Sequence, residues 1–580
     1  TKDRRDIEKA LKEFDSSEKT LLALEDTRSY WKKLSSQIAT QTADKDFDNW
    51  LRWVNIQPIL RKIFGCSFLP DFDYGKGGRG WRDLWQDCLC LILNNPEEVR
   101  PMLLNNFKGV RIDGSNATII GAKAGEFVAD RNNISRVWMD HGVWPTVTLD
   151  LYIQQTGDIN ILNEKESYFG CAQKGTILEH LILQNLVQFF NVGAHNNILL
   201  QGADWNDGLD MAKEAGESVA FSCVYAKNLE TICELIKRIE TDKIELLKEA
   251  ALLLDSSGEI DYSDPKTKQK QLKKYLAAIK PAVSGEKIYL NKDALLSDLK
   301  PKAAWLKQHI KTQEWLKEGF FNGYYDNKSQ RVEGNINGLM RMTLTGQVFP
   351  VMGGIADKDQ VKALFNNAKK YLQDKKLGGF RLNTDFGQEQ HDLGRAFSFV
   401  YGEKENGAFF NHMSVMFAYA LFKQNFISEG FEVFSSIYKM ALNTKTSRIF
   451  PCLPEYFNAQ GQGMYSYLTG SASWFMLTLL TQVFGIRGEY GNLLIEPKLT
   501  KEWFNPSNEA NITSNFAGKR IEIKFFNPKR KDYGRLAISK AAINGKIIAE
   551  KINKPSILIP RKTLLSLCNR ELNNIEIILV

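Results

Sequence analysis

The chain has 580 residues, of which 43% are hydrophobic and 25% are charged, proportions typical of a soluble globular protein. This length exceeds that of one ordinary core, so we expect several domains or one large helical domain. The 76 basic and 68 acidic residues are interleaved along the chain. No clustered basic face is evident, and no apolar run approaches the ~18 residues that a membrane helix requires. Nucleic-acid binding and membrane spanning are therefore disfavoured.

The eight cysteines are scattered, with Cys88 and Cys90 as the one close pair. The sequence contains no CxxC pair and no Cys/His ligand set, so we expect reduced, mostly buried thiols and no metal site. This pattern favours a cytoplasmic location.

The first residues, TKDRRDIEKALKEF, contain neither a Met nor a signal-peptide pattern, which predicts an internal start of a larger product. Residues 1–33 are highly charged and carry apolar residues at helical spacing. We therefore predict linker helices here rather than core elements.

Between residues 34 and 485, apolar helical stretches alternate with loops rich in Gly, Asn and Asp. Helices such as GTILEHLILQNLVQFF and SASWFMLTLLTQVFG are apolar nearly all round, as helices packed on two sides are. Helix pairs stacked in a ring would bring their polar loops together at one end, and the Trp, Asp, Asn, Arg and His of these loops suit a sugar site. The Lys-rich segment near residues 240–315 has weak periodicity and is predicted to be a peripheral insertion.

Residues 486–580 have a different pattern, with short alternating runs such as RIEIKFF and NIEIILV separated by turns. This pattern predicts an antiparallel β domain packed on the helical body.

The glycine-rich stretch GKGGRG, residues 75–80, matches the letters of a dinucleotide-binding fingerprint. The preceding FLPDFDY is no clean buried strand and no βαβ pattern surrounds it, so a dinucleotide site is excluded. We expect this loop to bring Arg79, Arg82 and Asp83 toward another ligand.

The stretch WRDLWQD places Asp83 and Asp87 four residues apart, on one face if a helix begins there. The same spacing arises in an intrahelical ion-pair pattern, and this alternative stays open. Residues 130–145, DRNNISRVWMDHGVWP, are too rich in charged and polar side chains for a dry core. They predict a loop in a polar pocket.

The stretch QGADWNDGLDM sets Asp204 and Asp207 around Trp205 and Asn206. A calcium loop is excluded, because Gly falls at the fifth position from Asp204 and not at the sixth. Asp207 or Asp210 could simply cap a helix. An indole face beside carboxylates and an amide is a common way to hold a pyranose, so a sugar site is favoured.

Two further stretches, KENGAFFNHMS and YSYLTGSASW, contain His412 and the pair Thr469-Gly470. Taken alone, His412 reads as a structural histidine and Thr469-Gly470 as an ordinary helix start. A hydroxyl and free backbone N–H groups at a helix N-terminus nevertheless form an anion site. A histidine brought to the same place would complete a phosphate cradle.

Taken in order, WRD-xx-QD, DWNDG, KENG-xxxx-H and TGSASW resemble the inverting glycoside phosphorylases of glycoside hydrolase family 94 and the related families 149 and 161. That group includes cellobiose, cellodextrin and β-oligoglucan phosphorylases. The resemblance covers the whole chain and implies a mainly α fold, an (α/α)6 barrel catalytic domain with a C-terminal antiparallel, jelly-roll-like β-sandwich. Family members carry an N-terminal β-sandwich domain that this chain lacks, so such a domain or a separate chain is an expected partner.

The resemblance also implies roles. Asp207 matches the general acid, and the substrate-binding residues are Arg82, Asp83, Asp204, Trp205 and Lys404. The implied phosphate-binding residues are His412, Thr469, Gly470 and Arg79. The loop GKGGRGWRD places Arg79 differently from the family pattern, which leaves its ligand open between phosphate and sugar.

The implied reaction is inverting phosphorolysis of β-linked gluco-oligosaccharides, in which phosphate attacks while Asp207 protonates the leaving oxygen. Phosphate is a co-substrate, and no metal or organic cofactor is expected. Two alternatives stay open, an inverting hydrolase with a carboxylate opposite Asp207 and a non-catalytic glycan-binding module. We expect a homo-oligomer.

Overall fold

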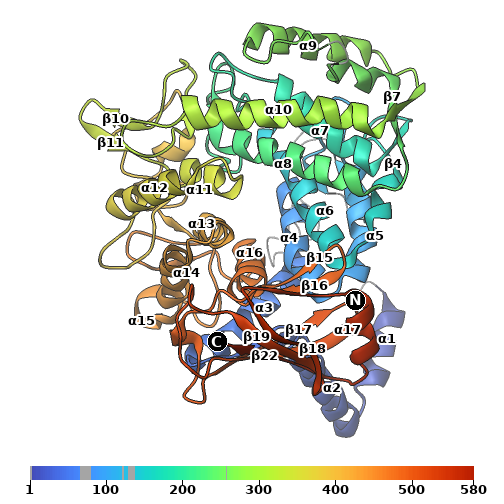
Figure 1. Ribbon diagram of the computed structural model, residues 1–580, viewed down its shortest axis with the longest axis vertical. Coiled ribbons are helices and arrows are strands. Elements are labelled where there is room, and N and C mark those ends of the chain that lie inside the picture. The colour runs from blue at the N-terminus through green and yellow to red at the C-terminus, as the bar shows by residue number, and fades with distance from the viewer. Residues whose placement is uncertain (1–2, 66–79, 121–122, 129–136, 256–257) are drawn as a thin grey trace.

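The computed structural model describes residues 3–65, 80–120, 123–128, 137–255 and 258–580. About 47% of the protein is helical, with a helical body and a separate sheet-rich C-terminal region (Figure 1). The mainly α fold class predicted from the sequence is confirmed at this level.

Six helices of the described chain pack in a closed ring, each on the next and the last on the first (Figure 1). They are α4 (Trp81–Asn94), α6 (Val143–Thr156), α8 (Val219–Arg238), α11 (Thr345–Met352), α13 (Asn411–Lys423) and α16 (Ser471–Thr478). All eight residues of α11 and of α16 are buried, as expected for helices that are covered on every side.

Further helices pack on the outside of this ring. They are α3 (Lys45–Phe64), α5 (Pro96–Phe107), α7 (Ile177–Phe190), α10 (Lys292–Gln313), α12 (Lys358–Tyr371) and α14 (Ile427–Leu442). In α12 the buried residues lie on one face, and Phe365 of this face lies 6.1 Å from Phe417 of α13 between ring centroids. The helical body therefore has two layers.

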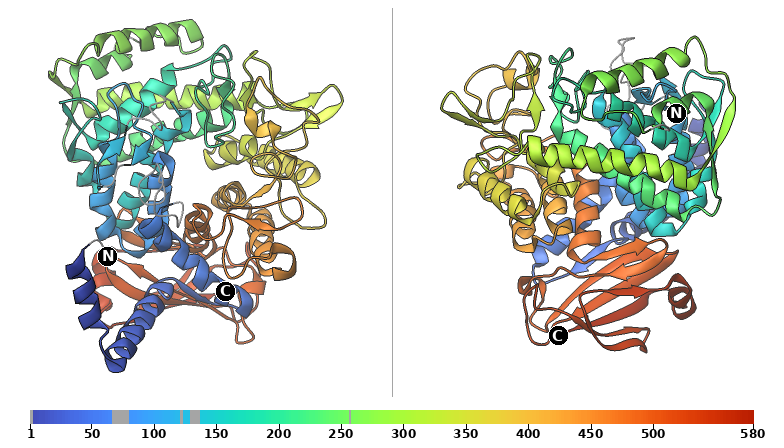
Figure 2. Two further views of the ribbon diagram at one scale, coloured as in Figure 1. Left: turned by 180° about the vertical axis from the view of Figure 1, so that it is seen from behind. Right: turned by 45° about the horizontal axis from the view of Figure 1, so that its top comes forward.

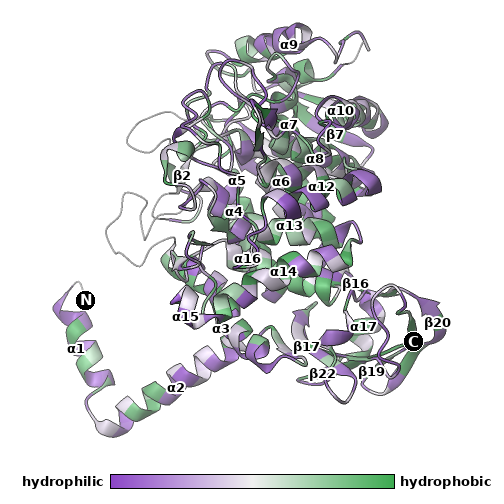
Figure 3. Cartoon of the chain, turned by 90° about the vertical axis from the view of Figure 1, so that its left-hand side faces the viewer, coloured by the Kyte–Doolittle hydropathy of each residue, from purple (hydrophilic) through white to green (hydrophobic). Residues whose placement is uncertain are grey.

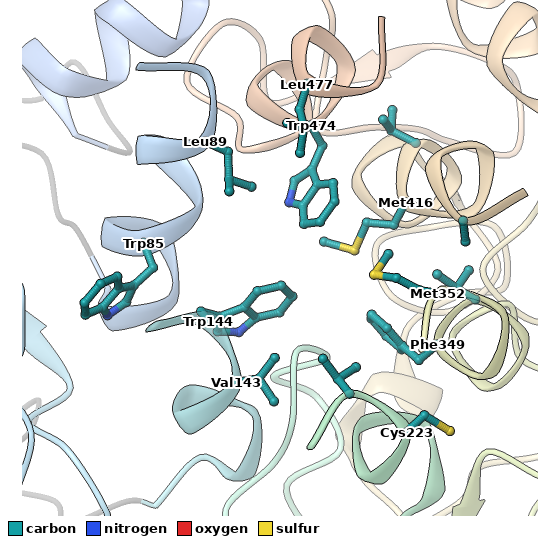
Figure 4. Close-up of a cluster of buried hydrophobic side chains, with 14 of the residues drawn as sticks. Trp85, Leu89, Val143, Trp144, Cys223, Phe349, Met352, Met416, Trp474 and Leu477 are labelled. Atoms are coloured by element: carbon teal, nitrogen blue, oxygen red, sulfur yellow. The ribbon is translucent and has the colours of Figure 1, made fainter. Parts of the chain in front are cut away.

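Aromatic and sulfur-containing side chains fill the centre of the ring (Figure 4). Trp144 and Trp474 meet edge to face with centroids 6.4 Å apart, and Phe221 lies 4.3 Å from Phe349. Met352 and Met416 lie beside them (Figure 4). This apolar plug lies between the two ends of the ring.

The segment predicted as a Lys-rich insertion contains α9 (Pro265–Ala278) and α10. The helix α10 lies along α8 and buries Leu299, Leu306 and Ile310. It thus contributes to the outer helical layer, whereas α9 packs on α7.

The C-terminal region contains a six-stranded sheet with the order β1-β17-β18-β22-β19-β20. Its strands are β1 (Ala39–Gln41), β17 (Glu509–Phe516), β18 (Lys519–Phe526), β22 (Asn573–Leu579), β19 (Ile538–Ile543) and β20 (Lys546–Lys554). The prediction of a purely antiparallel domain is wrong for one pair, because β18 and β22 run parallel. Three strands and α17 (Arg561–Leu567) separate them in sequence, which supplies the long crossover that a parallel pair needs.

A second sheet joins this region to the helices. It consists of β15 (Ile486–Glu489), β16 (Asn492–Ile495) and β21 (Ile557–Ile559). The strand β15 packs on α6, and Figure 2 shows the C-terminal sheets against one end of the helical body.

Short sheets join the loops of the helical body. They are β2 (Ile119–Ile120) with β3 (Phe127–Val128), β4 (Lys165–Ser167) with β5 (Lys174–Thr176), β6 (Glu217–Ser218) with β9 (Tyr324–Tyr325), β7 (Lys243–Leu247) with β8 (Lys287–Asn291), β10 (Gly334–Ile336) with β11 (Leu339–Arg341), and β12 (Phe409–Phe410) with β13 (Tyr456–Phe457) and β14 (Gly463–Met464).

The helices α1 (Arg4–Glu13) and α2 (Ser17–Ser35) form an arm that projects from the body (Figure 3). Neither helix contains a buried residue. No helix in the described ranges is long and apolar enough to cross a membrane.

Candidate active site

The sequence motifs meet at the end of the ring where its helices begin. Arg82 is the second residue of α4, Asp140 lies in the turn before α6, and Asp207 lies in the loop before α8. His412 is the second residue of α13, and Gly470 directly precedes α16. The first N–H groups and the dipoles of these helices therefore point toward one region, which favours anions there.

Arg82 connects three carboxyl-bearing residues. Its Nε and Nη2 donate to Asp140 at 2.6 and 3.0 Å, its Nη1 donates to Asp207 Oδ1 at 2.9 Å, and its Nη2 also donates to the Asp204 carbonyl at 2.8 Å. Burial alone would lower the pKa of Arg82, but Asp140 and Asp207 raise it, so the guanidinium stays charged. Because these bonds use four of the five guanidinium N–H groups, Arg82 is positioned to orient Asp207.

Asp207 is the accessible carboxylate of this group. Its side chain is 51% exposed, whereas that of Asp140 is fully buried. The surrounding protein still removes part of the hydration of this carboxyl, which raises the pKa of Asp207, and Arg82 opposes this shift. A ligand that displaced water from the exposed face would desolvate the carboxyl further and raise its pKa.

Asp204 differs from Asp207 because it is fully buried. Its Oδ1 accepts from the Asn206 N–H at 2.9 Å and its Oδ2 accepts from Ser218 Oγ at 2.9 Å. Burial and the neighbouring Asp140 raise the pKa of Asp204 to about 7. Both oxygens of Asp204 therefore hold the DWND turn, and its role in binding substrate stays a prediction.

Trp205 and His412 bring two of the motifs into direct contact. Their ring centroids are 5.6 Å apart with the planes nearly perpendicular. The imidazole of His412 also lies against Gly470, where an added Cβ would be 3.0 Å from Cε1. The DWND loop, His412 and the start of α16 therefore share one site, although they are far apart in the sequence.

Asp83 lies at the same end of the ring and pairs with Arg61 of α3. Arg61 Nη2 lies 2.9 Å from Asp83 Oδ1, and its Nε lies 2.7 Å from Asp87 Oδ1. Its Nη1 donates to the Leu468 carbonyl at 2.8 Å. Burial alone would raise the pKa of Asp83, but Arg61 and Arg82 lower it, so this carboxyl is ionised. Both acids therefore pair with Arg61 of a neighbouring helix.

Thr469 is fully buried, and its Oγ1 donates to Ser471 Oγ at 2.9 Å and accepts from the Ser471 N–H at 3.0 Å. The Glu455 carboxyl forms a hydrogen bond with Thr469. Burial raises the pKa of Glu455 to about 7. A phosphate held by the Thr469 hydroxyl would have to replace one of these contacts.

The family assignment follows from comparison with known proteins. A family model described as glycosyl hydrolase 94 superfamily, catalytic domain, matches residues 30–257 and 287–485. The chain belongs to the glycosyl hydrolase 94 superfamily. The family inferred from the four ordered motifs is thus confirmed.

Three of the relatives that the chain resembles at low identity show the range of activities. They are cyclic beta-(1,2)-glucan synthase NdvB of Rhizobium meliloti, 22% identical over 86% of this chain and 17% of the relative; solabiose phosphorylase of Paenibacillus borealis, 21% identical over 81% and 54%; and cellobionic acid phosphorylase of Neurospora crassa, 22% identical over 83% and 54%. The chain spans about half the length of these phosphorylases and less of the synthase.

Of the KENG stretch, Glu405 lies beside this family 94 site, and Lys404 directly precedes it in the sequence. Lys404 Nζ lies 5.0 Å from the Phe399 ring centroid. Burial raises the pKa of the adjacent Glu405, and the charge of Asp207 raises it further, so the two carboxyls are close enough to interact. Arg79 lies outside the described residues.

Four residues at the site were not predicted from the sequence as site residues. Asp140 was available as a signal within the polar stretch 130–145, and Gln86 lies within WRDLWQD. Arg61 and Glu455 carry no local signal, because Arg61 stands beside Lys62 in an otherwise apolar stretch and Glu455 is a single charged residue between Pro454 and Tyr456. Their partners are set by helix packing.

A separate cavity of about 550 Å³ lies at the opposite end of the ring, where the later turns of the ring helices meet β15 and β16. Its charged lining residues are Asp150, Lys227, Lys423, Arg487, Glu489, Glu496 and Lys498. Its lining, within the described part of the chain, includes none of the candidate active-site residues.

Proposed function

We propose that this member of family 94 is an inverting glycoside phosphorylase that removes glucose from the nonreducing end of β-linked gluco-oligosaccharides. The products are α-glucose 1-phosphate and a shortened acceptor, and the reaction is reversible. The observation that carries the proposal is the contact of His412 with both Trp205 and Gly470, which joins a sugar-binding motif to a helix start suited to an anion. Relatives named as phosphorylases support it.

Asp207 acts as the general acid. Its carboxyl is oriented by Arg82, and desolvation by the surrounding protein raises the pKa of Asp207. A bound sugar removes the remaining hydration of this carboxyl, so the acid is protonated when the substrate is in place. Asp207 then transfers its proton to the glycosidic oxygen as the C1–O bond breaks.

Phosphate is the nucleophile. It lies at the start of α16 beside His412 and Gly470, with the Thr469 hydroxyl released from Ser471 as a further donor. One phosphate oxygen forms the new bond to C1 from the face opposite the leaving oxygen, which inverts a β-linkage to an α-phosphate. Asp83 accepts hydrogen bonds from sugar hydroxyls, and Lys404 binds the acceptor sugar. The proton lost by Asp207 is replaced by the proton of hydrogen phosphate.

We also propose finer features of the fold. The ring and its outer helices form an (α/α)6 barrel over residues 34–485, and residues 486–580 form a jelly-roll-like sandwich. The arm formed by α1 and α2 serves as a linker that docks a second domain, a separate chain or another copy. Its exposed apolar side chains support this role: Ile7, Leu11, Phe14, Leu21, Leu22, Leu24 and Tyr30. We propose a cytoplasmic location.

One observation favours a second candidate, inverting hydrolysis. The Glu455 carboxyl lies beside Thr469, and an ionised carboxylate there could activate water and would repel phosphate. Glu455→Gln separates the two functions. A phosphorylase keeps phosphate-dependent turnover in this variant, whereas a hydrolase that uses Glu455 as its base loses turnover.

The direct test of the proposal is synthesis from α-glucose 1-phosphate with a panel of glucose and glucan acceptors. We expect release of inorganic phosphate and formation of a β-linked product, both lost in His412→Ala. Phosphate-independent release of reducing sugar that survives His412→Ala would instead establish a hydrolase.

A further inference from the structure

Gln86 lies one turn after Arg82 in α4 and is almost fully buried. Its Oε1 accepts from the indole Nε1 of Trp474 at 2.7 Å and lies 2.8 Å from Nε2 of His412. One side-chain oxygen thus connects the apolar plug of the ring to the histidine of the candidate active site.

This arrangement determines which nitrogen of His412 carries the proton. An indole N–H can only donate, so the Gln86 atom that it meets has to be the carbonyl oxygen. Exchanging the oxygen and nitrogen of the amide would set an NH₂ group against the indole N–H. The same oxygen faces His412 Nε2, so Nε2 has to donate as well, and Nδ1 is left as the acceptor of a neutral ring.

The surroundings of His412 keep the ring neutral. Burial lowers the pKa of His412 to about 3, with Asp83 opposing this shift and Arg61 and Arg82 adding to it. Among the described residues, no hydrogen bond to Nδ1 is present. The ring lies against Gly470, from whose added Cβ the Nδ1 atom would be 3.6 Å away, so Nδ1 lies beside the start of α16.

We infer that Gln86 positions His412 as a hydrogen-bond acceptor, so that the anion site selects oxyanions that carry a proton, hydrogen phosphate over sulfate. This inference rests on the proposed phosphorylase function. A P–OH group donates to Nδ1, which leaves the unprotonated phosphate oxygens to face C1 and the N–H groups of α16. Sulfate has the same tetrahedral shape, but at neutral pH it has no proton to donate and would place an oxygen lone pair against the nitrogen lone pair.

Oxyanion competition tests the inference in the unmodified protein. Arsenate is tetrahedral and carries a proton at neutral pH, so we expect it to replace phosphate in sugar release. Sulfate should bind at least tenfold more weakly than phosphate, so that its inhibition constant is at least tenfold higher than the KM for phosphate. Sulfate that competes as well as arsenate would overturn the inference. Absence of turnover with both phosphate and arsenate would instead refute the phosphorylase function.

Gln86→Glu provides the matched variant. Its carboxylate can still accept from Trp474 and His412, but its charge favours an imidazolium whose Nδ1 donates. We expect sulfate inhibition to strengthen about tenfold in this variant relative to Gln86→Met, which removes the acceptor without adding charge. Equal sulfate inhibition in the two variants would count against the role of Gln86.

The tautomer of His412 can be measured independently of turnover by NMR. The chain contains six histidines, so the number of imidazole signals is small. In protein with ¹⁵N-labelled histidine, the His412 signals, assigned by their loss in His412→Gln, should report the neutral Nε2–H form at pH 7. An imidazolium or the Nδ1–H form at that pH would contradict the inference even if Gln86→Glu failed to fold.

Discussion

The helix ring has a different electrostatic character at each end. At the end where the helices begin, Arg82 holds Asp140, Asp207 and the Asp204 carbonyl with four short hydrogen bonds. At the other end, the charges lie around an open cavity of about 550 Å³. Within the described chain, neither Lys423 nor Lys498 forms an ion pair there.

This difference follows from the direction of the helices. Helix N-termini carry partial positive charge, so carboxylates and a phosphate are stabilised where the helices begin. Helix C-termini carry partial negative charge, and Lys498 Nζ accordingly donates to the Phe422 carbonyl near the end of α13 at 2.6 Å. The same scaffold thus has one end where helix N-termini favour oriented anionic groups and a far end where a cationic side chain balances a helix C-terminus.

The substitution with the greatest expected effect removes the proposed proton donor at the end where the helices begin. Asp207→Asn should lower kcat for phosphorolysis by about 10³-fold, because the amide has no proton to transfer to the leaving oxygen. The matched control is Asp150→Asn in the far cavity, which should change kcat less than about twofold. Equal losses in the two variants, measured by release of sugar phosphate, would contradict the assignment of the acid.

The next effect concerns stability. Arg82→Met should lower the free energy of unfolding by about 3–5 kcal/mol, because Asp140 is left as a buried carboxylate without its partner. The control is Arg487→Met at the far end, whose ion pair with Glu496 is partly exposed and should contribute about 0–1 kcal/mol. Urea unfolding of both variants measures the difference. Similar losses of the free energy of unfolding in the two variants would mean that the ion pairs at the two ends contribute equally to stability.

The pH dependence of kcat/KM tests whether Asp207 acts as an acid. Only the protonated carboxyl can donate. Desolvation by the surrounding protein raises the pKa of Asp207, so kcat/KM should fall as pH rises through that pKa. Beyond it we expect about a tenfold decrease for each pH unit. A kcat/KM that increases steadily into the alkaline range would show that Asp207 acts as a base.

The smallest effect is expected at Lys498. Burial lowers the pKa of Lys498 to about 8, below its value of 10.5 in the unfolded chain. The unfolded state therefore binds more protons between these values, and the folded protein gains stability as pH rises from 8 to 10.5. Relative to Lys498→Met, the wild type should gain about 2 kcal/mol over this window in urea unfolding. A difference between the two proteins that does not vary with pH would contradict this.

The parts of the site that sequence could predict are those with short-range spacing. DWND, KENG-xxxx-H and TGSASW each place their polar groups within one loop or helix start, so their chemistry is visible in a few residues. The change from helical to alternating patterns near residue 486 likewise separates the body from the C-terminal sheets.

The remaining features depend on contacts between distant segments. Asp83 and Asp87 are spaced for one helix face, but their partner Arg61 lies on α3 and is set by helix packing. Asp204 and Asp207 occupy the same loop, yet one is buried and the other is exposed, and only the packing of Ser218 and Arg82 around the loop decides which. The parallel pairing of β18 and β22 depends on a long crossover in the same way.

In the proposed mechanism, phosphate takes the place of an activated water opposite Asp207. The direct measurement is proton NMR of the first product formed from a β-gluco-oligosaccharide, with and without inorganic phosphate. We expect α-glucose 1-phosphate with phosphate present and no cleavage without it. Free glucose that appears at the same rate in both samples would show that water, and not phosphate, is the nucleophile.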